Sequence, residues 1–505
     1  MLDVAVVGGG HNGLACAALL AQAGLQVAVY ERSDVLGGAA VSEPVWPGYT
    51  VSTASYVCTL LDPELVRVLD LPRHGYSAYR KDPATFNVLP DGRSLLLGSD
   101  EAANAREISR FDRDDVRGFN ELNRVICDLG SRLFETFDDQ SPHFANLGEQ
   151  VCEVLQGSAA QLVQRYVNTP VLQAAVATDG IIGTNAGPRD PGTAYVLAHH
   201  YAGRALGVQG AWGYVRGGMG AISTALASAA RAHGAAIHTA SAVERICIEN
   251  GAASGIVLRN GDEINARAVV SNAHPRTTFM DLAGKRHLSE TFVGKIQSWK
   301  TTGVAFKLNL ALGQLPNFRC RPGTRPDAHH RATIHIAPSI EYLQQAFEDT
   351  RDGGISKQPM LECFLQTPTD ATLAPPGKHI LSVFAQYYPY NHTDGWSSAQ
   401  CEAVADRIVY MLSQFAPNIP GAIEARQILS PPDLEKRFGL IGGHIFHGEL
   451  LPGQIYEHRF ATRTPIRQLY LCGSGAHPGG CVSGFPGKRA AAAILADVRQ
   501  MQAPA

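Results

Sequence analysis

The 505 residues contain no pair of cysteines spaced as CxxC or CxxxxC, although ten cysteines are present. Scattered cysteines are typical of a reducing compartment, whereas structural zinc sites and redox-active dithiols need closely spaced thiols. The sequence therefore predicts a cytoplasmic protein without a metal site and without a catalytic disulfide.

Blocks of like charge and long apolar runs are also missing. The 43 basic and 46 acidic residues give a net charge of −3, which argues against nucleic acid as a main partner. No stretch is long and apolar enough to span a bilayer, and the first expected strand begins at residue 3, which leaves no room for a signal peptide. The length and the 45% of hydrophobic residues predict two globular domains. Peripheral membrane contact and the oligomeric state stay open.

What the chain does contain is a dinucleotide-binding pattern at its start. The apolar run 4–7 predicts a strand buried on both faces, and residues 14–23 have the composition and spacing of a helix packed on it. Between them, Gly8 permits a tight turn, Gly10 lets the backbone approach a pyrophosphate, and Gly13 allows close helix–strand packing. A purely structural glycine turn is the alternative, but the strand, helix and second strand in one short unit favour a dinucleotide site.

An acidic residue follows where a ribose contact needs one. Glu31 closes the second strand, and its carboxylate would accept hydrogen bonds from ribose hydroxyls and repel a 2′-phosphate, which favours FAD or NAD over NADP. The other glycine cluster, Gly217-Gly218-x-Gly220, opens a helix but follows no buried parallel strand. A second dinucleotide site is therefore not expected, and oxygen or a quinone is the expected electron acceptor.

The remaining pattern predicts an α/β fold with a discontinuous Rossmann-type domain. Residues 102–176 have helical periodicity, and several apolar or alternating runs between 302 and 388 predict a second, mixed or mostly antiparallel sheet. We expect a cofactor-binding domain from residues 1–85, 205–285 and 440–505. The substrate-binding domain, with inserted helices, would comprise residues 86–204 and 286–439.

Four motifs make the chain resemble the FAD-dependent phytoene desaturase and amine oxidase superfamily. They are the glycine turn at 8–14, Gly-Gly-Ala-Ala-Val at 37–41, the glycine-rich segment 210–220, and Leu-Cys-Gly-Ser-Gly-Ala-His-Pro-Gly-Gly at 471–480. Within that superfamily the chain is similar to the phytoene-dehydrogenase-related proteins and to pyridine nucleotide-disulphide oxidoreductase domain-containing protein 2. The resemblance runs nearly end to end and implies FAD as the cofactor.

The resemblance also implies which residues hold FAD. The ADP half would contact the fingerprint and the segment after Glu31, and the flavin would lie beside the C-terminal loop, where a helix beginning near 482–484 would aim its positive end at the flavin. The implied residues are Gly8, Gly10, Gly13, Glu31, Arg32, Gly38, Ala39, Val243, Gly473, Ser474, Gly480, Val482 and Gly484.

Two residues are candidate catalytic groups. His447, in a loop before the last strand, could take a proton as hydride leaves, although a hydrogen-bonded structural histidine is the alternative. Lys307 lies on the face of the expected strand 304–312 that carries small and polar side chains. This face could form a cavity wall or could simply be solvated. His444, His477, the pair His199-His200 and Cys481 are weaker candidates, with packing roles as the alternative.

These observations predict an FAD-dependent dehydrogenase, oxidase or desaturase that removes hydride from a hydrophobic or partly conjugated small molecule. Two other functions stay open. One is a flavin amine oxidase, and the other is a flavoprotein that binds partners without turnover. The sequence names neither the substrate nor the base.

Overall fold

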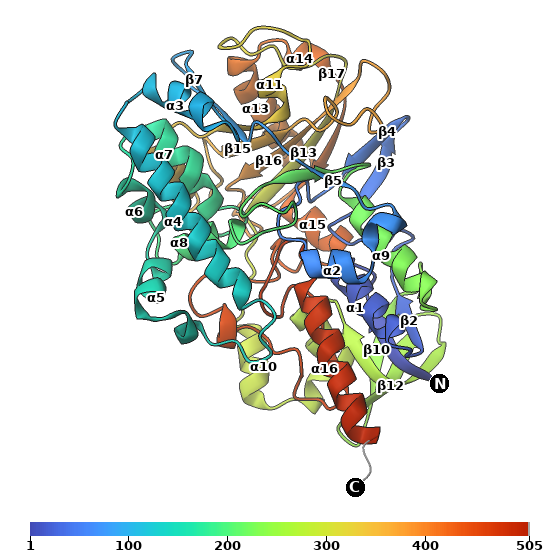
Figure 1. The fold of residues 1–505 in the computed structure, drawn as a ribbon. Coiled ribbons are helices and arrows are strands. Elements are labelled where there is room, and N and C mark those ends of the chain that lie inside the picture. Colours follow the sequence, from blue (N-terminus) through green and yellow to red (C-terminus); the bar gives the residue numbers. More distant parts are fainter. Residues whose placement is uncertain (503–505) are drawn as a thin grey trace.

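The computed structural model describes residues 1–502 and is built around two large sheets (Figure 1). The first sheet has the strand order β10-β11-β12-β1-β2-β9, and β18 pairs with β12 on the other edge of the parallel part. β1 is parallel to β2 and β12, β9 is parallel to β2, and β18 is parallel to β12, while β10 and β11 form an antiparallel extension. The strands are β1 (Leu2–Val7), β2 (Val27–Tyr30), β9 (Ala236–His238), β10 (Val243–Glu249), β11 (Ala252–Leu258), β12 (Glu263–Ser271) and β18 (Leu469–Leu471).

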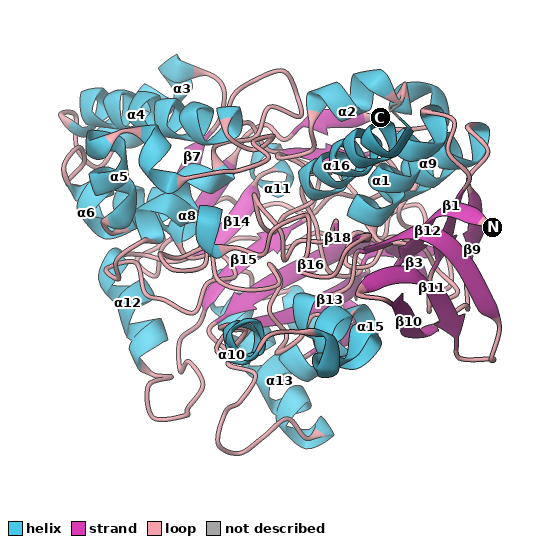
Figure 2. Cartoon of the chain, turned by 90° about the horizontal axis from the view of Figure 1, so that it is seen from below, coloured by secondary structure: helices cyan, strands magenta, loops and turns pink. Residues whose placement is uncertain are grey.

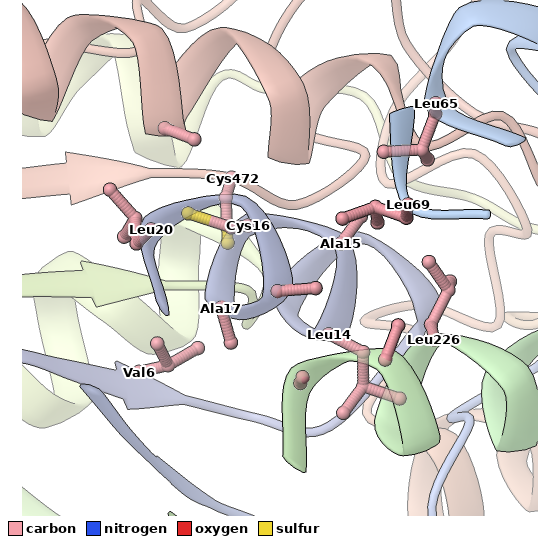
Figure 3. Packing of buried hydrophobic residues seen from close by; sticks show 14 of the residues in the cluster. Val6, Leu14, Ala15, Cys16, Ala17, Leu20, Leu65, Leu69, Leu226 and Cys472 are labelled. Carbon is pink, nitrogen blue, oxygen red and sulfur yellow. The ribbon is translucent and has the colours of Figure 1, made fainter. Parts of the chain in front are cut away.

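Three helices cover one face of this sheet: α1 (His11–Gln22), α9 (Gly220–Ala232) and α16 (Phe485–Gln502). Small side chains on α1 let these helices approach closely, since Ala15, Cys16 and Ala17 are completely buried. Figure 3 shows this cluster, with Val6 of β1 on one side of α1 and Leu65 of α2 (Pro63–Val68) on another. The first unit of strand, helix and strand therefore forms where the apolar periodicity predicts it.

The second sheet has the order β17-β13-β16-β15-β14-β6-β7. All its neighbouring strands are antiparallel except β14 and β6, which are parallel, so the predicted mixed sheet is present. Helix α13 (Ser398–Phe415) packs on the apolar face of this sheet. The strands are β6 (Thr85–Val88), β7 (Ser94–Leu97), β13 (Ala305–Leu312), β14 (Thr333–Ile336), β15 (Met360–Phe364), β16 (His379–Gln386) and β17 (Ile423–Leu429).

The predicted helical insertion lies beside the second sheet (Figures 1 and 2). Its helices are α3 (Glu101–Ser109), α4 (Asp115–Glu135), α5 (Glu149–Gln156), α6 (Ala159–Gln164), α7 (Pro170–Ala177) and α8 (Thr193–His200). Shorter helices complete the fold: α10 (Glu290–Gln297), α11 (Ala328–Arg331), α12 (Ile340–Glu348), α14 (Ile419–Ala422) and α15 (Pro431–Phe438).

Two small antiparallel pairs join the sheets, β3 (Ser42–Trp46) with β4 (Tyr49–Ser52) and β5 (Ala78–Arg80) with β8 (Gly213–Val215). Because β8 pairs antiparallel with β5, the glycines before α9 do not follow a parallel strand, as predicted. Within residues 1–502, no helix combines the length and the apolar character that a membrane crossing requires.

Candidate cofactor and substrate site

A cavity of about 980 Å³ begins at the carboxyl ends of β1, β2 and β12 and extends to the second sheet. Gly8, Glu31 and Asn272 follow those three strands and line it, and Lys307 of β13 lines its far end. In sheets of this type, ligands bind beyond the carboxyl ends of the parallel strands. The volume is at the upper end of the range for small-molecule and cofactor sites.

The glycines of the fingerprint bring the chain close to this cavity. Gly8 has φ +96°, which favours glycine, and a Cβ on Gly10 would lie 2.6 Å from Asn272 Nδ2. A Cβ on Gly13 would collide with the carbonyl oxygen of Gly8. No side chain caps the N-terminus of α1, so its first N–H groups are available to an anion in the cavity.

Glu31 is nearly buried, and its carboxylate organises the turn around it. Oε2 accepts a hydrogen bond from the Gly9 N–H at 2.7 Å, and Oε1 accepts one from the Ser33 N–H at 2.9 Å. Each carboxylate oxygen can accept a second hydrogen bond, so both remain available to ribose hydroxyls. Arg32 also lines the cavity, but its guanidinium donates to the carbonyl oxygen of Arg437 at 3.1 Å.

The other residues implied by the resemblance divide into two groups. Five line the cavity: Gly38, Ala39, Val243, Ser474 and Val482. Four lie behind its wall, where a Cβ would meet neighbouring atoms: Gly13 at Gly8, Gly473 at Asn272, Gly480 at Phe446 and Gly484 at Leu65. The structure gives these four a packing role, Gly13 within α1 and the other three in loops, and their direct contact with FAD stays a prediction.

His447 lies in the cavity wall with φ +57°, and its ring is 5.1 Å from that of His274. Burial, and then the positive charge of Arg459, lower the pKa of His447 to about 3. Burial likewise lowers the pKa of His11, the residue after Gly10, to about 4. These imidazoles are neutral near pH 7, and with such low pKa values they are weak proton acceptors.

Lys307 projects from β13 into the far end of the cavity wall and is 2% exposed, so it does not extend into water as a solvated face would require. Its Nζ donates to Ser382 Oγ at 2.5 Å and lies 4.4 Å from the centre of the Tyr56 ring. Burial lowers the pKa of Lys307 to about 7. A neutral amine is therefore available near neutral pH, and of the two predicted groups Lys307 is better suited to accept a proton.

The weaker candidates lie in different surroundings. Of the adjacent pair, His200 lines the cavity and His199 does not. His477 faces away, where its Nε2 lies 3.0 Å from the carbonyl oxygen of Thr136, and His444 Nε2 lies 3.2 Å from Glu449 Oε1. Cys481 lines the cavity, but burial raises the pKa of its thiol to about 12, which keeps it protonated and unsuited to covalent attachment of a flavin.

Several lining residues were not predicted from the sequence. The inner end of the cavity is apolar and aromatic, and its side chains come from segments that are far apart in the chain. No local spacing signals such an arrangement. They are Tyr56, Ile182, Trp212, Phe384, Ile445 and Phe446.

One cluster of acidic side chains outside the cavity has the spacing of a metal site, formed by Asp62, Glu64 and Asp138. The ammonium group of Lys488 already contacts all three carboxylates. Within the described residues this cluster is therefore a set of ion pairs that joins α2, α16 and the end of the α4 region.

Comparison with known proteins agrees with the geometry. Residues 13–495 match the family model described as flavin containing amine oxidoreductase. The chain belongs to this family. It is 39% identical, over 99% of its length and 94% of the relative, to pyridine nucleotide-disulfide oxidoreductase domain-containing protein 2 of Mus musculus. It is 26% identical, over 99% of both chains, to phytoene desaturase (lycopene-forming) of Pseudescherichia vulneris.

A solved structure shows the same fold at lower sequence similarity. A triple mutant of putrescine oxidase superposes with a TM-score of 0.65 at 16% identity and covers 99% of each chain. Together these comparisons identify the protein as an FAD-dependent oxidoreductase of the α/β class. The similarity to phytoene desaturases and amine oxidases predicted from the motifs is confirmed.

The residues that line the cavity fit FAD. The uncapped N-terminus of α1 suits the pyrophosphate, and the Glu31 carboxylate retains acceptor capacity for ribose. When bound, FAD supplies an acceptor for a hydride. With FAD bound, the aromatic side chains of the wall would exclude water and orient a substrate, and Lys307 Nζ is the group in the wall that could hold or accept a proton.

Proposed function

We propose that the protein dehydrogenates a hydrophobic or partly conjugated small molecule. The observation that carries this proposal is the inner end of the cavity, where Tyr56, Trp212 and Phe384 form an apolar wall with a single lysine in it. Burial of an apolar substrate against this surface would stabilise its binding, and Lys307 is the polar group in the wall that can receive a proton. The similarity to a phytoene desaturase supports an apolar substrate.

Amine oxidation is the second candidate, because the matched family is described as flavin containing amine oxidoreductase. A cationic ammonium substrate would, however, meet Lys307 whenever that lysine is protonated, and like charges in a buried site repel each other strongly. The apolar substrate is therefore favoured. The third function, a flavoprotein that binds partners without turnover, predicts no reduction by either class of compound.

The proposed electron acceptor is oxygen or a quinone. The sequence has one dinucleotide fingerprint, which FAD would occupy, and no second fingerprint that would bind NAD or NADP as the acceptor. All ten cysteines are free in the structure, which supports the cytoplasmic location that we propose. We propose no nucleic-acid partner, given the net charge of −3.

Anaerobic mixing of the holoenzyme with candidate substrates tests these alternatives. Unsaturated terpenoids and lipids of graded length form one panel, and primary and secondary amines form the other. Loss of the visible absorption of oxidised flavin with the first panel is the expected result. Reduction by amines alone would replace the proposed function with amine oxidation, and no reduction by either panel would favour the non-catalytic function.

A further inference from the structure

A single row of side chains crosses the second sheet and begins at the cavity wall. Lys307 of β13 pairs with Phe384 of β16, which pairs with Glu362 of β15, which pairs with His335 of β14. Directly paired residues of neighbouring strands point to the same face of a sheet. Each of these four side chains is at most 4% exposed. The sheet therefore places a buried carboxylate two strands away from the lysine in the cavity wall.

Glu362 has no hydrogen-bond partner on either carboxylate oxygen, and it is completely buried. The nearest ring nitrogen, His335 Nε2, is 3.9 Å from Oε1. A buried carboxylate without partners is strongly unfavourable unless cations and bound water compensate it. This position is therefore not explained by packing alone.

Two buried lysines, Lys307 and Lys81, lie close enough to this carboxylate for its charge to raise the pKa of each. Lys307 Nζ donates to Ser382, and Lys81 Nζ donates to Thr333 and lies 5.3 Å from the centre of the Trp212 ring. Each ammonium group has three donors, and one protein acceptor is present for each in the described residues. The unused donors and the two Glu362 oxygens are complementary, and neither lysine is within ion-pair distance of Glu362, which leaves room for bridging water.

The remaining titratable groups that face this cluster come from other elements. Asp179 lies in the turn after α7, between α7 and α8, Tyr56 follows β4, and His200 ends α8. Cys363 is the neighbour of Glu362 on β15 itself. Burial raises the pKa of both Asp179 and Tyr56 well above their ordinary values, and it lowers the pKa of His200. Each of these shifts favours the uncharged form of the group, and Glu362 is the carboxylate that shares the sheet face of Lys307.

We propose that Glu362 is a positioning residue for Lys307, linked to it through bound water, and that it both fixes the charge state of this lysine and receives the proton that the lysine accepts. The second part rests on the proposed function. Dehydrogenation releases one proton for each hydride removed. That proton first converts the neutral amine of Lys307 to an ammonium group. It then passes to a Glu362 oxygen, so that the carboxylate becomes a carboxylic acid and the amine is regenerated.

The electrostatics agree with this geometry. Burial lowers the pKa of Lys307 to about 7, and the negative charge of Glu362 acts in the opposite direction. Removing that charge should lower the pKa of the lysine further, because nothing then offsets the cost of burying an ammonium group. A side chain that is uncharged, or too far from the lysine to interact with it, would not affect the lysine in this way.

Competitive acetylation of the holoenzyme measures the lysine directly and needs no substrate. Only a neutral amine reacts with acetic anhydride, so the extent of Lys307 labelling across pH gives its midpoint by peptide mass spectrometry, with the exposed Lys285 as the internal reference. In Glu362→Gln the midpoint should fall by about one pH unit or more. In Glu362→Asp, where the charge is kept but drawn back, a smaller fall is expected.

An unchanged or raised Lys307 midpoint in Glu362→Gln would overturn the proposal, whatever substrate the enzyme uses. Should that variant fail to retain FAD, Glu362→Asp provides the same test, and an unchanged or raised midpoint there has the same meaning. A lowered midpoint together with a failed substrate screen would instead support the role of Glu362 in setting the charge and reject the proposed function.

A reduction assay tests the proton transfer. The rate of flavin reduction in Glu362→Gln should have its acid limb at lower pH than in the wild type and a lower plateau. In a Lys307→Met background, adding Glu362→Gln should not shift the pH profile further. A shift of the same size in that background would show that Glu362 acts independently of Lys307, against the proposal.

Discussion

Replacing Glu31 with alanine should weaken FAD binding through two separate losses. The carboxylate holds the Gly9 and Ser33 N–H groups at 2.7 and 2.9 Å, and in the complex it would also accept the ribose hydroxyls. Alanine removes the ribose contacts and leaves two backbone donors without their acceptor. The first loss concerns the bound state only, and the second also destabilises the turn in the free protein.

The size of the effect can be worked from these contacts. A hydrogen bond to a charged group contributes roughly 1.5–3 kcal/mol, so two ribose contacts amount to about 3–6 kcal/mol. At about 1.4 kcal/mol per tenfold change, the dissociation constant for FAD should rise at least roughly a hundredfold. The free protein should also unfold more readily, by roughly 1–3 kcal/mol for each backbone donor that stays buried without a partner.

Two measurements separate these losses. Titration of the apoprotein with FAD, followed by flavin fluorescence, gives the dissociation constant, and urea unfolding of the apoprotein gives its stability. Glu244→Ala is the matched control, because Glu244 also lines this end of the cavity but is exposed and paired with Arg259. An FAD dissociation constant within about threefold of the wild type in Glu31→Ala would refute the assignment of Glu31 to the ribose.

Three further outcomes are expected. Acid precipitation of the yellow protein should release all its FAD, because the thiol of Cys481 stays protonated; flavin that remains on the polypeptide would contradict this. In Lys307→Met, flavin reduction by substrate should slow by roughly 10²–10⁴-fold. The rate should also no longer rise through about pH 7, where the wild-type lysine loses its proton. An unchanged rate and pH profile would remove Lys307 from the site. In Arg459→Lys, the free energy of unfolding measured with urea should fall by about 2–4 kcal/mol. The buried guanidinium donates to the carbonyl oxygens of Phe446, Glu449, Gln454 and Ser474, and an ammonium group cannot reach all four. An unchanged unfolding midpoint would show that these hydrogen bonds are dispensable.

The parts of the fold that were predictable are those that short-range pattern controls. The first strand, helix and strand are set by local apolar periodicity and by glycines at fixed spacing, and β13 to β16 follow alternating or apolar runs. Three strands near the two ends of the second sheet, β6, β7 and β17, were not predicted. β6 and β7 have four residues each, and β17 (Ile423–Leu429) is largely polar. β6 and β17 pair with strands from distant parts of the chain, β14 and β13, and β7 is held in the sheet through β6.

The candidate site divides in the same way. Gly8, Gly10 and Glu31 were found because one continuous segment must build the turn that faces a pyrophosphate and ribose. Tyr56, Trp212 and the other side chains of the inner wall were not found, because each is an ordinary residue in its own segment and becomes part of a site only after two sheets and a helical insertion meet.

Lys307 shows where the limit of such reasoning lies. Period-two alternation correctly separates its face of β13 from the apolar face, but alternation within one strand cannot say whether the polar face meets water or protein. That is decided by the neighbouring strands, which bring Ser382 and Glu362 to the same face, and by the loop that carries Tyr56. Most lysines in proteins are exposed to solvent, so a lysine judged from its sequence context alone is expected to be solvated. The pairing of β13, β16 and β15 places Lys307 on the same face as the buried Glu362, whose charge is proposed to set the charge of the lysine. This relation depends on strand pairing and is not visible in any one segment of the sequence.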